Sequence, residues 1–272
     1  YNYKVKGFIV MKYPDDFINK IICGDCLEIL KEIPDNCVDL VFTDPPYNEN
    51  YKYRNSGFKD KRDDYYSFIE SVFIEIKRVL KDTGSFYLKH SSRQIDKILP
   101  MLNKYFIFRN LIVWISNSQA HPEMNYDSYY EPIYFYTKTN NYIFNKRAEL
   151  REKPKDYWSG SNKEFVGLLV NCWYDIKKVG AGCLRRVEGG KIGNIKLHPC
   201  SMPKRLAERV IKVSSNEDSL VLDPFLGSGT TAVACKELNR NFISIEINPD
   251  YCKIAEERIK AYQNKPKQQS FV

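Results

Sequence analysis

The stretch VDLVFTDPPYN, at residues 38–48, begins as a hydrophobic run and ends in two consecutive prolines followed by Tyr47 and Asn48. The run at 38–42 is short and mostly apolar, which is typical of a buried β-strand. Pro45 and Pro46 have a fixed φ angle and no N–H, so they cannot lie inside a helix or a central strand. The sequence therefore predicts that Asp44 stands where a strand ends, at the edge where open α/β sheets bind ligands. A rigid surface turn is the simpler alternative for a single Pro-Pro step.

Strand-like and helix-like patterns alternate on both sides of this stretch. Expected strands cover residues 20–23, 38–42, 85–89, 110–115, 132–137, 220–222 and 242–245. Expected helices cover 27–33, 68–80 and 203–213, a further helix ends at 238, and the last begins at 251. Asp63 and Asp64 are candidate caps of the second helix. This alternation predicts an α/β fold, with a doubly wound, mostly parallel sheet and helices on both faces.

A glycine loop, DPFLGSGTT at residues 223–231, joins one of these strands to the next helix. Gly227 is expected to permit a sharp turn, and Gly229 to let a ligand approach the backbone. The third glycine of a dinucleotide fingerprint is missing, and no lysine follows as in a phosphate-binding P-loop. Glu246 ends the next strand, 17 residues after Gly229, where its carboxylate can accept both ribose hydroxyl protons. The unit therefore favours a nucleoside ligand without phosphates.

Residues 145–197 interrupt the alternation. They contain seven of the 13 glycines, and their twelve Lys or Arg against six Asp or Glu give +6 of the net charge of +8. Aromatic side chains are interleaved with these positive charges: Tyr157, Trp158, Trp173 and Tyr174. The pattern predicts an irregular, basic insertion that contacts nucleic acid, with a solvated charged face as the alternative.

The composition of the 272 residues, 43% hydrophobic and 28% charged, is that of an ordinary globular protein. We find no signal peptide and no apolar run of membrane-spanning length, so we expect a cytoplasmic protein without a membrane partner. The eight cysteines are expected to be reduced and mostly buried. The three histidines are scattered, so no metal site is expected.

Two of these motifs together resemble a known family, the amino-group DNA methyltransferases. Asp44-Pro45-Pro46-Tyr47 resembles their catalytic quartet, and Phe225-x-Gly227-x-Gly229 resembles their cofactor loop. The quartet comes first, 179 residues before the loop when the two aspartates are compared, as in the β-group of the family. The resemblance covers residues 20–262. It implies a circularly permuted class I methyltransferase sheet, S-adenosylmethionine as cofactor and DNA as substrate.

The resemblance also divides the chain. Residues 1–144 would be the catalytic half of the methyltransferase domain, 145–197 a small target-recognition insertion, and 198–272 the cofactor-binding half. Within the catalytic half, the strand at 112–114 and Glu131 resemble the region beside the target base. The loop at 48–64, which mixes aromatic and basic residues, is well placed to close over DNA.

The resemblance further implies a set of cofactor-binding residues. Asp25 would bind the adenine amino group, next to Cys26 at the start of a helix, while Cys23 belongs to the strand core. His198 resembles the segment near the methionine end of the cofactor, although Cys200, Ser201 and Met202 replace the Thr, Gln and Lys common there. The full set is Asp25, Cys26, His198, Asp223, Phe225, Gly227, Gly229, Thr230 and Glu246.

The quartet suits methylation of an exocyclic amino group, whose lone pair is delocalised into the ring. The Asp44 carboxylate and the Pro45 carbonyl can accept the two amino hydrogens and direct the nitrogen lone pair toward the methyl group. Pro45 and Pro46 keep these acceptors rigid, which is catalysis by positioning. The Tyr47 ring offers a face to a base flipped out of the duplex. Neither a metal nor a covalent intermediate is required, and Pro199-Cys200 does not lie at a strand end where a cytosine-C5 nucleophile belongs.

Several alternatives stay open at this point. Asp44 favours adenine N6 as the target atom, whereas the segment at 198–203 is more similar to versions in cytosine-N4 enzymes. An RNA or protein N-methyltransferase is a more remote reading, and a non-catalytic nucleoside- or DNA-binding module is the alternative outside enzymes. A cognate restriction endonuclease is a candidate partner, and the chain could act as a monomer or a homodimer.

Overall fold

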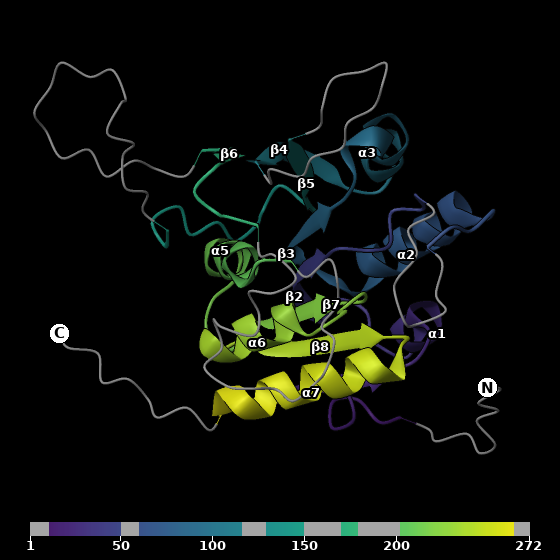
Figure 1. Cartoon of the computed structure of the whole chain (residues 1–272), viewed down its shortest axis with the longest axis vertical. Helices are drawn as coiled ribbons and strands as arrows, with labels where there is room; N and C mark the ends of the chain where they lie inside the picture. Colours follow the sequence, from purple (N-terminus) through teal and green to yellow (C-terminus); the bar gives the residue numbers. More distant parts are fainter. Residues whose placement is uncertain (1–10, 50–59, 116–128, 150–169, 179–201, 264–272) are drawn as a thin grey trace, which may run out of the picture.

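The computed structural model describes residues 11–49, 60–115, 129–149, 170–178 and 202–263 (Figure 1). Its strands are β1 (Lys20–Cys23), β2 (Val38–Thr43), β3 (Leu80–Lys89), β4 (Ile107–Ile115), β5 (Tyr130–Thr137), β6 (Cys172–Trp173), β7 (Leu220–Asp223) and β8 (Asn241–Glu246). Its helices are α1 (Cys26–Lys31), α2 (Tyr65–Val79), α3 (Ile95–Asn103), α5 (Lys204–Ser214), α6 (Thr230–Glu237) and α7 (Pro249–Gln263), with a 3-10 turn, η1 (Ser92–Gln94), before α3.

One eight-stranded sheet holds these elements together, in the order β1-β8-β7-β2-β3-β5-β4-β6. Neighbouring strands from β1 to β3 are parallel, as are β4 and β6. Only β5 runs antiparallel to its two neighbours, β3 and β4. The predicted α/β class and mostly parallel sheet are confirmed. Because β2 leads outward to β3 while β7 leads the opposite way to β8, the strand order reverses between β2 and β7.

The sheet is covered on both faces (Figure 1). Val41 and Leu222 pack with buried residues of α1, α2 and α3. Leu40 and Val221, their neighbours in β2 and β7, pack with α5, α6 and α7 on the opposite face. Successive strand residues point to opposite faces, so both sets must be apolar when both faces are buried. This explains why the strands read as continuous hydrophobic runs.

Four details differ from the sequence expectations. Cys23 is exposed rather than in the strand core, because it is the last residue of β1, which lies at the edge of the sheet. Asp64 precedes α2 without capping it, since its carboxylate pairs with Arg62 instead. Helix α3 was not anticipated; it contains Pro100 and buries Ile98 among its apolar residues. Residues 172–173, within the stretch expected to be irregular, form β6.

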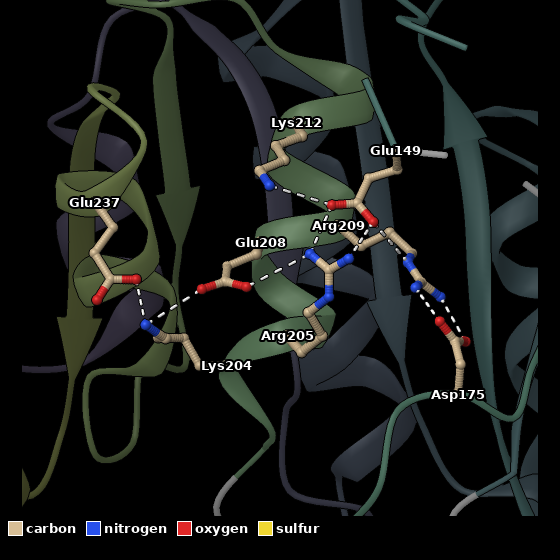
Figure 2. Close-up of polar contacts among 8 residues, drawn as sticks. All are labelled: Glu149, Asp175, Lys204, Arg205, Glu208, Arg209, Lys212 and Glu237. Carbon is tan, nitrogen blue, oxygen red and sulfur yellow. Dashed lines mark hydrogen bonds and ion pairs between the residues drawn. The ribbon is translucent and has the colours of Figure 1, made fainter. Parts of the chain in front are cut away.

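The chain on each side of residues 150–169 is attached to α5 (Figure 2). Glu149 accepts two hydrogen bonds from Arg205, both of 2.6 Å, and lies 3.3 Å from the Lys212 ammonium. Arg209 contacts Glu149 at 3.4 Å and also pairs with Asp175, just after β6. Glu149 and Arg209 are both buried. One helix therefore fixes the two described pieces of the predicted insertion.

None of the described helices is both long enough and apolar enough to cross a membrane.

Candidate active site

The predicted quartet and the glycine loop meet at the point where the strand order reverses. The Thr43 hydroxyl, at the end of β2, donates a 2.8 Å hydrogen bond to the Asp223 carboxylate at the end of β7. Asp44 follows directly on one side, and the loop at 224–229 follows on the other. Two motifs 179 residues apart thus stand side by side at the carboxyl ends of adjacent parallel strands, the usual ligand position in such sheets.

The Asp44 carboxylate lies within a cluster of polar side chains. It accepts a 2.6 Å hydrogen bond from the Tyr47 hydroxyl, and the Lys89 ammonium lies 3.2 and 3.1 Å from its two oxygens. Lys89 also contacts the Tyr47 hydroxyl and the Glu131 carboxylate. The Asp44 side chain is 21% exposed and that of Lys89 only 6%. Burial raises the pKa of Asp44, and the ammonium and the hydroxyl only partly offset this effect.

The backbone of the quartet is held by side chains from α2 and from the end of β3. The Tyr65 hydroxyl donates to the Pro46 carbonyl at 2.7 Å and lies 2.7 Å from His90 Nε2. Because that hydroxyl has a single hydrogen, we assign the proton of His90 to Nε2. Burial lowers the pKa of His90 to about 3, so the ring is neutral. Its ring centroid lies 4.9 Å from that of Tyr47.

The Pro45 carbonyl has no hydrogen-bond donor among the described residues, and Pro45 itself is buried. The structure therefore brings together an ionisable carboxylate and a proline carbonyl without a donor; their role as a pair of acceptors for a substrate stays a prediction. Proline has no N–H, so this acceptor sits on a rigid, donor-free segment.

The glycine loop adopts the left-handed backbone that its glycines allow. Gly227 has φ +58° and Gly229 has φ +93°. A Cβ on Gly227 would meet no atom within 4 Å, whereas one on Gly229 would lie 2.7 Å from the Ala255 Cβ. We expected Gly229 to lack a side chain so that a ligand could approach the backbone. This is wrong, because Ala255 of α7 occupies the place that a side chain would take. The open side of the loop is at Gly227.

Glu246 and Asp25 lie at the same edge of the sheet as the glycine loop. Glu246 Oε2 accepts the Gly227 N–H at 2.8 Å, and its Oε1 accepts the Asn248 N–H at 2.8 Å. Asp25 follows β1, whose last residue pairs with Glu246 in β8. Asp25 Oδ1 caps α1 by accepting the Leu27 N–H at 2.8 Å. The ribose role of Glu246 and the adenine role of Asp25 stay predictions.

Other predicted cofactor residues face inward beneath the loop. Asp223 is buried and accepts the Phe225 N–H at 3.1 Å, and burial raises its pKa to about 6. Thr230 is buried at the start of α6, and its hydroxyl lies 3.4 Å from the Met202 carbonyl. Cys26 begins α1 as expected, and burial raises the pKa of its thiol to about 12. Asp223 and Thr230 therefore border the loop at its two ends, whereas Cys26 belongs to α1.

Several predicted positions lie outside the described residues: His198, Tyr157 and Trp158, and 50–59 in the loop after the quartet. Sequence reasoning found Glu131 but missed Lys89, His90 and Tyr65. A signal for Lys89 was present, since a lysine directly after the apolar run 86–88 at a strand end is unusual. Within the described ranges, no group of three or more His, Cys, Asp or Glu side chains could hold a metal ion.

Comparison with known proteins gives consistent matches. A family model described as DNA methylase, for N6 and N4 methyltransferases, matches residues 38–257. The chain is 36% identical over 245 residues to the DNA adenine methyltransferase YhdJ of Escherichia coli K12, covering 88% of this chain and 82% of that protein. It is 32% identical over 248 residues to the type II methyltransferase M.HpaI of Haemophilus parainfluenzae, covering 90% of this chain and 75% of that one.

Among solved structures, the cytosine-N4-specific PvuII DNA methyltransferase superposes with a TM-score of 0.67 at 19% identity, covering 89% of this chain and 90% of the other. The M1.HpyAVI complex with SAM superposes with a TM-score of 0.57 at 24% identity, covering 88% and 98%. At these identities the likeness concerns the fold.

Proposed function

Since the chain belongs to the N6/N4 DNA methylase family, we propose that it transfers a methyl group from S-adenosylmethionine to adenine N6 in DNA. One observation supports this most directly. The Asp44 carboxylate stands next to the glycine loop, because Thr43 and Asp223 join the ends of β2 and β7 at 2.8 Å. A base gripped at Asp44 and a nucleoside held at the loop would therefore be neighbours.

The residues present fit the cofactor. The loop is open at Gly227, and the Glu246 carboxylate already binds the Gly227 N–H, so a ribose at this edge would find an acceptor beside an accessible backbone. Asp25 would hold the adenine amino group. When bound, S-adenosylmethionine supplies a methyl group whose bond to sulfur breaks, with the electron pair staying on sulfur, as the nitrogen lone pair bonds to the carbon. The methylated amino group then releases one proton to solvent.

The chain itself supplies positioning. Asp44 and the Pro45 carbonyl accept the two amino hydrogens, which directs the nitrogen lone pair away from the ring. Tyr65 keeps the proline segment in place through its bond to the Pro46 carbonyl. The Tyr47 ring, packed beside the neutral His90 ring, offers a face to the flipped base.

Adenine is favoured over cytosine for two reasons. Family members with an aspartate at the first position of the quartet mostly act on adenine, and a relative of 36% identity is named a DNA adenine methyltransferase. Cytosine N4 is the second candidate, because the segment at 198–203 is similar to versions in cytosine-N4 enzymes.

DNA contact is assigned to the basic residues of 145–197 and of the loop at 48–64. Screening of phosphate contacts should then make binding fall steeply with salt. A cognate restriction endonuclease, a monomeric or dimeric state and a location in the cytoplasm belong to the same proposal.

The test is methylation of unmodified DNA by the purified chain, followed by mass spectrometry of the nucleosides. We expect N6-methyladenine from the wild-type chain, and about 100- to 1000-fold less from Asp44→Ala in the same time. N4-methylcytosine without N6-methyladenine would replace adenine by cytosine as the target. No methylated base at all, from a folded protein that binds S-adenosylmethionine in calorimetry, would contradict the proposal.

A further inference from the structure

A buried lysine stands next to the proposed catalytic carboxylate, and the mechanism above does not use it. Lys89 ends β3, and its ammonium lies 3.2 and 3.1 Å from the two oxygens of Asp44 on the adjacent strand. The same ammonium contacts Glu131 from β5 and the Tyr47 hydroxyl. With 6% of its side chain exposed, Lys89 cannot exchange these partners for water. All of its hydrogen-bonding capacity is directed into the site.

This placement answers a difficulty in the proposed mechanism. Asp44 must be ionised to accept an amino hydrogen, yet burial raises its pKa. An ammonium at 3 Å favours the carboxylate form. Burial alone would disfavour the ammonium, but Asp44 and Glu131 outweigh this effect and raise the pKa of Lys89. Lys89 therefore favours the ionised form of Asp44, and the two carboxylates keep Lys89 protonated, whereas the charge of Glu131 raises the pKa of Asp44.

The sum of the charges has a further consequence. Asp44, Lys89 and Glu131 together carry −1, whereas Asp44 and Lys89 alone would carry zero. The reaction moves positive charge from the donor sulfur to the amino nitrogen, so a net negative site facing that path is favourable. Glu131 supplies the missing charge and shares the Lys89 ammonium with Asp44.

We propose that Lys89 and Glu131 are positioning residues for methyl transfer, in which Lys89 holds Asp44 as a fixed carboxylate and Glu131 restores one net negative charge to the site. This inference rests on the proposed function.

The other titratable groups around Asp44 come from four elements. They are Tyr47 in its own turn, His90 after β3, Asp223 at the end of β7 and Lys178 after β6. Lys178 lies 3.6 Å from Glu131, but its side chain is 47% exposed, so water screens it. His90 is neutral, which leaves Lys89 as the buried cation among the described residues of this cluster.

The test compares Lys89→Met with Lys89→Arg in single-turnover methylation from pH 5.5 to 9. Lys89→Met should lower the rate at pH 7 by about 10- to 100-fold, up to the ~100-fold loss that misplacement of a reacting group can cause. The rate should recover as the pH rises, because deprotonated Asp44 returns. Lys89→Arg keeps the charge and should restore the acid side of the pH profile. The Kd for S-adenosylmethionine and the KM for DNA should stay within about twofold.

Glu131→Gln tests the role of Glu131 separately from that of Lys89. It should lower the rate without moving the acid side of the profile to higher pH, because Lys89 still holds Asp44 ionised. In Lys89→Met the two carboxylates face each other, so adding Glu131→Gln should bring the profile back toward lower pH. Lys81→Met is the matched control. Lys81 pairs with Asp39 at 2.8 Å between the same two strands, at the opposite end, and its loss should leave the profile unchanged.

A measurement without DNA keeps the inference testable on its own. A ¹³C NMR titration of the Asp44 carboxyl, assigned with Asp44→Asn, should give a higher pKa in Lys89→Met than in wild type. An equal pKa, or an equal rate loss at every pH, would overturn the inference. A wild-type chain that methylates no DNA would contradict the proposed function instead, while the NMR comparison would still decide whether Lys89 holds Asp44 ionised.

Discussion

Two buried clusters of charges in this molecule look alike and differ in one respect. In the first, Lys89 joins Asp44 and Glu131 at the carboxyl ends of β2 and β3 and the amino end of the antiparallel β5. In the second, Arg209 joins Glu149 and Asp175 beside α5 (Figure 2). Both unite residues that are distant in the sequence. A buried ion cluster alone is therefore no sign of an active site.

The difference lies in what each cluster leaves for a ligand. Glu149 is 3% exposed at its side chain and meets three cations, from Arg205, Arg209 and Lys212, so its acceptors are all occupied within the protein. Asp44 is 21% exposed and stands where a strand ends beside a loop that is open at Gly227. The proposed function places a base at the first cluster, whereas the ion pairs of the second hold the segments around residues 149 and 175 against α5. Substitutions in the first cluster should therefore affect methyl transfer, and substitutions in the second should affect stability.

The largest effect is expected from Asp44→Ala. Removing the carboxylate should lower methyl transfer about 100- to 1000-fold, as for the loss of one preorganised group that faces developing charge. Stability should change by less than about 1 kcal/mol, since Lys89 keeps Glu131 as a partner. The measurement is the steady-state rate with labelled S-adenosylmethionine, together with urea unfolding. A variant with more than a tenth of the wild-type rate would contradict the assignment.

Glu149→Gln should act on stability and leave the chemistry alone. It removes the buried carboxylate that three cations share and leaves Arg209 with Asp175 alone, whose side chain is 38% exposed. Breaking a buried ion pair typically costs about 3–5 kcal/mol. The expected loss is seen in the urea midpoint, while the rate of the folded protein at the quartet stays near wild type. Glu237→Gln is the matched control, because Glu237 pairs with the partly exposed Lys204 and should cost under about 1 kcal/mol. Equal losses of stability in both variants would show that the buried ion pairs of Glu149 are worth no more than the partly exposed pair of Glu237 and Lys204.

Asp223→Asn should change how the free energy of unfolding depends on pH, compared with wild type. The pKa of Asp223 is raised to about 6 in the folded protein, so its stabilising contribution is present below pH 4 and is lost as the pH rises through 6. Asparagine keeps the acceptor for Thr43 and Phe225 and removes the buried charge. The variant should gain at most about 3 kcal/mol over wild type at pH 8, and little at pH 4. The measurement is urea unfolding of both proteins at pH 4 and pH 8. A difference in the free energy of unfolding that is the same at both pH values would contradict the raised pKa of Asp223.

The smallest effect is expected from Lys81→Met. Lys81 and Asp39 join β2 and β3 at the amino ends of the strands, and the lysine side chain is 40% exposed. Such a pair is worth under about 1 kcal/mol. Asp39 keeps its bond to the Leu220 N–H at 2.8 Å. Unfolding and methylation assays should both resemble wild type. A large loss of methylation activity would show that the ion pair at the amino ends of β2 and β3 is needed for catalysis, although Asp44 lies at the other end of these strands.

The sequence by itself determined the strands, the quartet and the glycine loop. Apolar runs mark strands buried on both faces, as in β2 and β7, and proline and glycine limit φ wherever they stand. It also placed Glu246, because a strand of the next unit must end at the same edge. These are local properties, or follow from the regular repeat of strand and helix.

Tertiary structure alone decided which side chains meet. Lys89 reaches Asp44 only because β3 lies next to β2, and Glu131 joins them because β5 lies beyond β3. The same holds for Gly229, whose missing side chain makes room for α7, and for Cys23, which is exposed because β1 is an edge strand. Strand order and register are set by packing across the whole sheet, so no local pattern specifies these partners.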